Sequence, residues 1–179
     1  MSSATSGSGS AASTMTPEEV PEDLIASSRL LHISGISQAI SNSACDAVFE
    51  AVKLAKKHNV TVTYDPNVRL KLWSWDRAKA IINATVPYSD IFMPSLEDAE
   101  TLTGMSGSDK ITDYYHSLGV SIVVLKLGKN GVMVSDGKQK KIIPGYVVET
   151  VDQTGAGDTF DGAFCARYVK GATPFEAAQ

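Results

Sequence analysis

One short segment near the C-terminus has the residue types of an anion-binding helix start. In Thr154-Gly155-Ala156-Gly157-Asp158, two glycines flank one alanine, so the backbone is bare enough for an anion to contact successive N–H groups. The helix macrodipole favours negative charge at the same place. Asp158 lies in the first turn, where its carboxylate can accept the proton of an attacking hydroxyl while the N–H groups hold a phosphoryl group. The segment predicts a base and an anion hole in one helix turn.

An ordinary capped helix has a similar pattern. A glycine followed three residues later by an acid satisfies N–H groups at many helix starts. The motif alone leaves both interpretations open. Asp152, two residues before Thr154, is by the same reasoning a candidate turn-forming aspartate.

Three other loops follow predicted strands and carry candidate ligand contacts. In residues 65–69, an arginine that can bind phosphate in bidentate fashion follows an asparagine that can bond a nucleotide or sugar oxygen, although a solvated loop would look alike. In residues 94–98, Ser95 is a candidate N-cap of the helix that follows. In residues 126–131, glycines let a nucleotide approach the backbone, and a simple glycine-rich turn is the alternative.

Strands and helices alternate along the chain, which predicts an α/β fold with a mainly parallel sheet and helices on both faces. In such sheets the ligand lies beyond the carboxyl ends of the strands, where these loops are. Asp136-Gly137 between two short apolar runs predicts an antiparallel hairpin at one edge. The expected strands are 30–33, 60–64, 91–93, 121–125, 131–135 and 140–143, and the expected helices are 16–27, 42–58, 77–85, 96–102, 110–118, 156–169 and one from 174.

Composition excludes several classes of protein. The formal net charge is -4 and the pI is near 5.3, which gives no electrostatic footprint for nucleic acid or an anionic membrane. Two cysteines and three scattered histidines form neither a disulfide framework nor a zinc site, so we expect a cytoplasmic protein. Residues 1–14 are small and polar, which predicts a flexible N-terminal arm before a folded part from 15 to 179.

The run VDQTGAGDTFDGAF, placed after a β/α series, resembles the second signature of the ribokinase-like (PfkB) carbohydrate kinases. The resemblance implies ATP-dependent phosphorylation of a sugar-like hydroxyl. Asp158 would be the base that meets the sugar, and the amides of residues 155–158 would be the anion hole. Asp152 matches the leading acid of the signature, which in this family is often linked to a monovalent cation such as K⁺.

The stretch DPNVRLKLW resembles the 2-keto-3-deoxygluconate kinases within the same family. The resemblance implies that Asn67 and Arg69 contact ATP. Ser95 and Asp98 depart from the Asn-x-x-Glu tetrad of the family, so we expect them to act on Mg²⁺ through water rather than directly.

Residues 126–131 border ATP in this family. The resemblance makes Gly128 the main expected nucleotide contact of that loop, with Lys126 and Gly131 beside it.

The resemblance covers only the later part of a family member. The first βα units, which in the family carry a Gly-Gly signature, much of the sugar pocket and a lid that often mediates dimer formation, have no counterpart here. The family also continues beyond the position of Gln179 into helices that complete the adenine pocket. We therefore expect an incomplete ribokinase-like domain that lacks an N-terminal part and the C-terminal end and, in the full-length protein, a homo-oligomer. Fructokinase or another sugar kinase is one alternative function, and a truncated, non-catalytic nucleotide-binding or interaction module is another.

Overall fold

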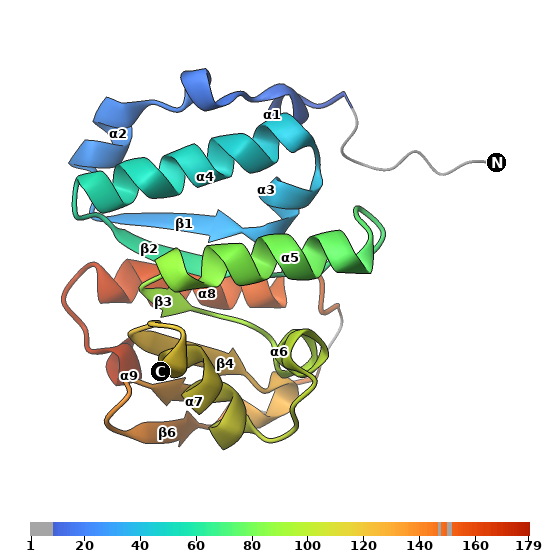
Figure 1. The fold of residues 1–179 in the computed structure, drawn as a ribbon. Helices are drawn as coiled ribbons and strands as arrows, with labels where there is room; N and C mark the ends of the chain where they lie inside the picture. The colour runs from blue at the N-terminus through green and yellow to red at the C-terminus, as the bar shows by residue number, and fades with distance from the viewer. Residues whose placement is uncertain (1–8, 147, 150–151) are drawn as a thin grey trace. The chain divides into compact units, whose positions relative to one another are not determined.

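The fold is given by a computed structural model, which describes residues 9–146, 148–149 and 152–179. The chain divides into two compact units, residues 1–89 and 90–179. Each unit combines parallel strands with covering helices (Figure 1). The predicted α/β class is therefore confirmed.

The first unit is built around two parallel strands, β1 and β2, paired from Leu30 opposite Thr61 to Ser34 opposite Asp65. The long helix α4 begins at Asn42, because Ser41 caps its N-terminus by accepting a hydrogen bond from the Ala44 N–H. The elements are α1 (Ala11–Thr14), η1 (Pro17–Glu19), α2 (Glu22–Ser27), β1 (Leu30–Ser34), α3 (Gly35–Ala39), α4 (Asn42–Lys57), β2 (Thr61–Asp65), α5 (Trp75–Thr85) and η2 (Val86–Tyr88).

A buried polar network ties three elements of this unit together. The Tyr64 hydroxyl on β2 donates to Gln38 Oε1 on α3 at 2.8 Å, and Gln38 Nε2 donates to Thr85 Oγ1 on α5 at 2.9 Å. Gln38 and Tyr64 are completely buried. Buried polar groups require such partners, so this network fixes the position of α3 directly after β1.

The second unit has a four-stranded sheet in the order β3-β4-β5-β6, in which β3 and β4 are parallel and the remaining pairs are antiparallel. The predicted hairpin is confirmed as β5 and β6, whose connection runs over residues 136–139. The elements are β3 (Ile91–Phe92), α6 (Leu96–Thr103), α7 (Ser108–Ser117), β4 (Ile122–Lys126), η3 (Gly128–Asn130), β5 (Val132–Ser135), β6 (Lys140–Ile143), α8 (Ala156–Tyr168) and α9 (Pro174–Ala177).

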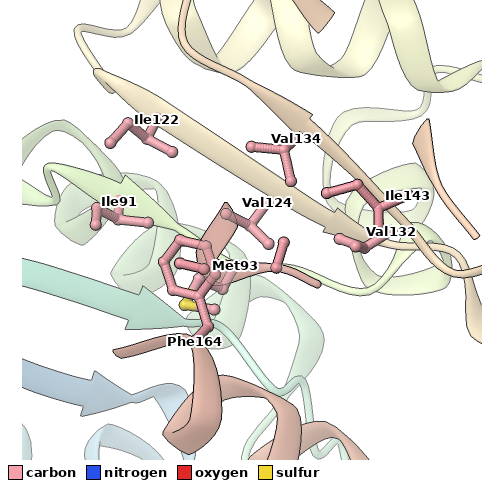
Figure 2. Close-up of a cluster of buried hydrophobic side chains, with 10 residues drawn as sticks. Ile91, Met93, Ile122, Val124, Val132, Val134, Ile143 and Phe164 are labelled. Atoms are coloured by element: carbon pink, nitrogen blue, oxygen red, sulfur yellow. The ribbon is translucent and has the colours of Figure 1, made fainter. Parts of the chain in front are cut away.

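One face of this sheet packs on the two C-terminal helices. Figure 2 shows Phe164 of α8 among apolar side chains from all four strands. On β4, Ile122 and Val124 belong to this cluster, whereas the alternating residues Val123 and Leu125 are fully buried on the opposite face. A strand that is buried on both faces reads as a continuous apolar run, which explains why β4 could be located from sequence.

The N-terminal region differs from its prediction in one respect. A single helix from 16 to about 27 was expected, but η1 and α2 are separate. Val20 is extended, with φ of -72° and ψ of 116°, because the residue before a proline is disfavoured in the helical region and Pro21 follows it. At the start of η1, the Thr16 N–H donates to Glu19 Oε2 at 2.8 Å.

The predicted flexible arm lies largely outside the described residues. Residues 1–8 are not described, and Ala11–Thr14 form the short helix α1, capped by Ser10. Flexibility of the arm stays a prediction.

Candidate active site

The first turn of α8 has an open backbone. Gly155 is its N-cap and has φ of 75°, the left-handed conformation that glycine adopts without strain. Ala156 N–H donates to Gln153 C=O at 3.2 Å, and the first helical bond runs from Thr159 N–H to Gly155 C=O at 2.8 Å. The N–H groups of Gly157 and Asp158 thus lie outside the helical hydrogen bonds of the described residues, so they are the donors of the candidate anion hole.

Asp158 is the third residue of α8, and its side chain is exposed. Its place in the first turn sets the carboxylate at the end of the helix where the free N–H groups are. The exposure leaves it accessible to a hydroxyl of a bound molecule. Both features are those expected of a base beside an anion hole.

Lys126, the last residue of β4, reaches the same turn. Its ammonium donates to Asp161 Oδ2 at 2.9 Å, and the two side chains are only 16% and 2% exposed. A Cβ atom at Gly157 would lie 3.7 Å from Lys126 Nζ. The structure therefore brings Lys126 and Gly157 together, and it adds Asp161, which the sequence reasoning missed.

A signal for Asp161 was present in the sequence. Asp161, Phe164 and Tyr168 share one stripe of α8 at helical spacing. Phe164 is fully buried and Tyr168 packs against the core cluster. An acid on an apolar stripe requires a buried partner. Lys126 was expected in the loop of residues 126–131, so its pairing with Asp161 was not predicted.

Ser95 lies beside Lys126 at the carboxyl ends of two parallel strands. The two residues form an isolated parallel bridge, and Lys126 N–H donates to Pro94 C=O at 2.9 Å. Ser95 Oγ accepts a hydrogen bond from Asp98 N–H at 3.0 Å, so Ser95 is the N-cap of α6, as its position suggested. Asp98 is half-buried in the first turn of the same helix.

Gly128 and Gly131 differ in their surroundings. Both have positive φ, but a Cβ atom at Gly128 would meet nothing within 4 Å, whereas at Gly131 it would lie 2.0 Å from Ile143 C=O. Gly128 is thus open to a ligand. Gly131 has a packing reason to be glycine, because the backbone after β6 passes directly over it.

Asp152 forms the turn that its residue type suggested. Its Oδ1 accepts a hydrogen bond from Thr154 N–H at 2.8 Å, and this bond holds the pKa of the exposed carboxyl below its ordinary value. The side chain stays ionised at neutral pH. Its role in binding a cation stays a prediction.

Asn67 and Arg69 belong to the first unit, in the loop after β2. Asn67 has a left-handed φ of 34°, and its N–H donates to Asp65 Oδ1 at 3.1 Å. Arg69 is exposed and Asn67 is half-buried. A Cβ atom at Gly35 would lie 2.0 Å from Pro66 C=O, so the residue after β1 packs directly on this loop.

No group of three or more His, Cys, Asp and Glu side chains is placed to hold a metal ion within the described ranges 9–146, 148–149 and 152–179. Within the same ranges, every helix is too short or too polar to cross a bilayer.

The fold is of the α/β class, and the start of α8 is a candidate anion site. Comparisons with known proteins show to which family the chain belongs. A sequence profile described as pfkB family carbohydrate kinase matches residues 3–179. The chain is 37% identical over 154 residues to 2-dehydro-3-deoxygluconokinase of Bacillus subtilis (strain 168), covering 84% of this chain and 47% of that protein. It is 34% identical over 169 residues to fructokinase-2 of Solanum lycopersicum, covering 90% and 50%. The chain belongs to the pfkB family of carbohydrate kinases.

A solved structure supports the same conclusion. A candidate ribokinase II from E. coli, in complex with ATP and Mg²⁺, superposes with a TM-score of 0.83 at 28% identity, covering 92% of this chain and 53% of that one. The chain spans about half the length of the curated relatives it matches. This coverage agrees with the expectation of a partial ribokinase-like domain.

Proposed function

We propose that this chain carries the phosphoryl-transfer centre of an ATP-dependent carbohydrate kinase that acts on a sugar or sugar-acid hydroxyl. The observation that carries the proposal is the first turn of α8, in which the exposed Asp158 shares one helix turn with the open N–H groups of residues 157 and 158. Family membership supplies the reaction class.

Each residue of the turn has a defined part in this reaction. Asp158 accepts the proton of the attacking hydroxyl, which makes the oxygen a better nucleophile. The open amides of Gly157 and Asp158 stabilise the charge on the transferring phosphoryl group, and the backbone of Gly155 and Ala156 completes the proposed anion hole. Base and anion hole are held at a fixed spacing, because they belong to one helix turn.

ATP is the proposed phosphoryl donor. Lys126 and Gly128 are the proposed contacts in the second unit, with Ser95 and Gly131 beside them, and Asn67 and Arg69 are the proposed contacts in the first unit. The open space at Gly128 and the exposed guanidinium of Arg69 are compatible with these roles.

Mg²⁺ is the proposed metal. It usually keeps several waters and is held by one or two carboxylates plus substrate phosphates. The half-buried Asp98 beside Ser95 fits that requirement without a protein cage. Mg²⁺ would neutralise charge on the phosphates. A monovalent cation such as K⁺ at Asp152 is part of the proposal, since that carboxylate is ionised and exposed.

The proposed substrate is 2-keto-3-deoxygluconate, converted to its 6-phosphate. The support is the 37% identity to an enzyme named for this substrate, 2-dehydro-3-deoxygluconate being another name for it. A fructokinase is the second candidate, because a plant fructokinase is nearly as similar, at 34%. A cytoplasmic location and a homo-oligomer of the full-length protein belong to the same proposal.

A non-catalytic nucleotide-binding or interaction module is the alternative from another class. It is suggested by the span of the chain, about half of its curated relatives, because positioning supplies most of the catalysis in phosphoryl transfer. A module of this kind would bind ATP without sugar turnover.

The deciding experiment measures ADP release by the intact gene product with ATP, Mg²⁺ and either 2-keto-3-deoxygluconate or fructose. Turnover with the first sugar that falls by about 10²- to 10⁴-fold in Asp158→Asn is the expected result. Asp76→Asn is the matched control, because Asp76 is also an exposed acid in the first turn of a helix. ATP binding with no turnover of any sugar would overturn the kinase proposal.

A further inference from the structure

The Lys126–Asp161 pair is electrostatically unusual. A cation near the N-terminus of a helix opposes the macrodipole and is disfavoured there. Yet Lys126 Nζ lies within the first turns of α8, 3.7 Å from the Cβ position of Gly157. The bond to Asp161 Oδ2 at 2.9 Å offsets this repulsion. The fold therefore keeps a cation beside the helix start at which an anion is proposed to bind.

The pair is also well fixed in position. Asp161 is anchored in α8 one turn after Asp158 and is 2% exposed, and Lys126 is 16% exposed at the end of a buried strand. A lysine on a flexible stem normally loses considerable rotamer entropy when it is ordered. Here the bond to Asp161 already holds the ammonium in one place, which lowers the entropy that binding a ligand would lose.

The two acids of the α8 start are suited to different tasks. Asp158 is exposed and can reach a substrate hydroxyl, whereas Asp161 is buried and bonded to an ammonium. Asp161 is therefore not a second base. Its geometry is that of a group that acts through another side chain.

We infer that Asp161 is a positioning residue that holds the Lys126 ammonium beside Gly157, so that the nucleotide phosphates meet a fixed cation together with the open amides of α8. The inference rests on the proposed function and deepens it. In this arrangement the start of α8 supplies backbone amides, Lys126 of β4 supplies the positive charge, and Asp161 holds that charge in place.

A purely structural role is the competing explanation, in which the pair only anchors α8 to β4. That role would change stability and would weaken the binding of every ligand alike. A positioning role acts on phosphate selectively. The ratio of ATP affinity to adenosine affinity separates the two, because both ligands share the nucleoside and only ATP carries phosphates.

The test measures the Kd of ATP and of adenosine by calorimetry for the intact gene product. Lys126→Met is expected to weaken ATP binding by about 10- to 100-fold, the range for a hydrogen bond to a charged group, while adenosine is unaffected. Asp161→Asn keeps the side-chain shape and is expected to weaken ATP binding by a smaller factor, again with adenosine unaffected. Lys126→Arg keeps the positive charge and should bind ATP more tightly than Lys126→Met does.

The double variant Asp161→Asn/Lys126→Met should bind ATP no more weakly than Lys126→Met alone, because Asp161 acts through the lysine. Two controls are matched to the pair. Lys138→Met removes an exposed lysine from the connection between β5 and β6, and Asp113→Asn breaks the Lys140–Asp113 pair of the same unit, at 2.7 Å. Both are expected to leave the ATP-to-adenosine ratio unchanged.

Each outcome has a defined meaning. An unchanged ratio in folded Lys126→Met, or equal losses of ATP and adenosine binding in Asp161→Asn, would overturn the positioning role even if the wild type phosphorylates sugar. Another outcome is that the variants lose ATP binding selectively while the wild type turns over no sugar. That combination would support the positioning role and refute the kinase proposal. Should Asp161→Asn fail to fold, the Lys126 variants still decide the question.

Discussion

Replacement of Gly131 by alanine should strongly destabilise the second unit. Gly131 has φ of 90° and ψ of -133°, a region that is essentially restricted to glycine. The added Cβ would lie 2.0 Å from the carbonyl oxygen of Ile143 and 2.5 Å from the backbone nitrogen of Gly145. Both contacts are with backbone atoms, so no side-chain rotation relieves them.

The magnitude follows from two separate terms. The strained backbone contributes about 1–3 kcal/mol, and overpacking against fixed atoms contributes about 1–3 kcal/mol more. We expect a loss of about 4 kcal/mol in the free energy of unfolding. Gly128→Ala is the internal comparison, since its φ of 60° is also positive but its Cβ would meet nothing within 4 Å, and we expect about 1–2 kcal/mol.

Urea unfolding followed by circular dichroism measures both variants. With slopes of about 1–3 kcal/mol per molar urea, the difference between the variants should exceed about 0.5 M in midpoint. Equal midpoints for Gly131→Ala and Gly128→Ala would refute the reasoning, because the backbone contact would then carry no energy. ATP affinity should show the opposite order. If Gly128 contacts the nucleotide as proposed, Gly128→Ala should lose more ATP affinity than Gly131→Ala.

Three further changes test other parts of the structure. Phe164→Ala should lower the free energy of unfolding by about 3–5 kcal/mol, because the fully buried ring leaves a cavity in the core cluster; thermal unfolding measures this, and a loss below about 1 kcal/mol would contradict the burial. Tyr64→Phe should cost about 1–3 kcal/mol by removing the donor to Gln38 Oε1, with a neutral result arguing against the network. Hydrogen bonds from the backbone N–H groups of residues 139 and 138 hold the pKa of Asp136 below its ordinary value, so its stabilisation is complete above about pH 4 and is lost as the pH falls through the lowered pKa. The Tm difference between wild type and Asp136→Ala should therefore shrink from pH 7 to pH 3, and a constant difference would refute this assignment.

The order of strands and helices was predictable because burial on both faces leaves a plain sequence pattern. β4 is an uninterrupted apolar run, and the predicted hairpin followed from Asp136-Gly137. The separation of η1 from α2 follows from Pro21, which the prediction of one helix over 16–27 did not take into account. Short elements such as α3 were missed, since five residues after a strand carry too little periodicity.

The candidate site was predictable only where it lies within one segment. The α8 start could be located because glycines and acid are neighbours in sequence, and the turn made by Asp152 follows from its residue type. The pairing of Lys126 with Asp161 spans 35 residues and depends on how β4 and α8 pack. No local pattern encodes that contact.

Gly35 has a consequence for how variants of this protein should be interpreted. Its missing side chain lets the backbone after β1 touch Pro66, in the loop that carries Asn67 and Arg69. Any larger residue at position 35 must displace that loop while contacting no ligand itself. If that loop contacts the nucleotide as proposed, a change in nucleotide affinity can originate at position 35, which a comparison of contact residues alone would pass over.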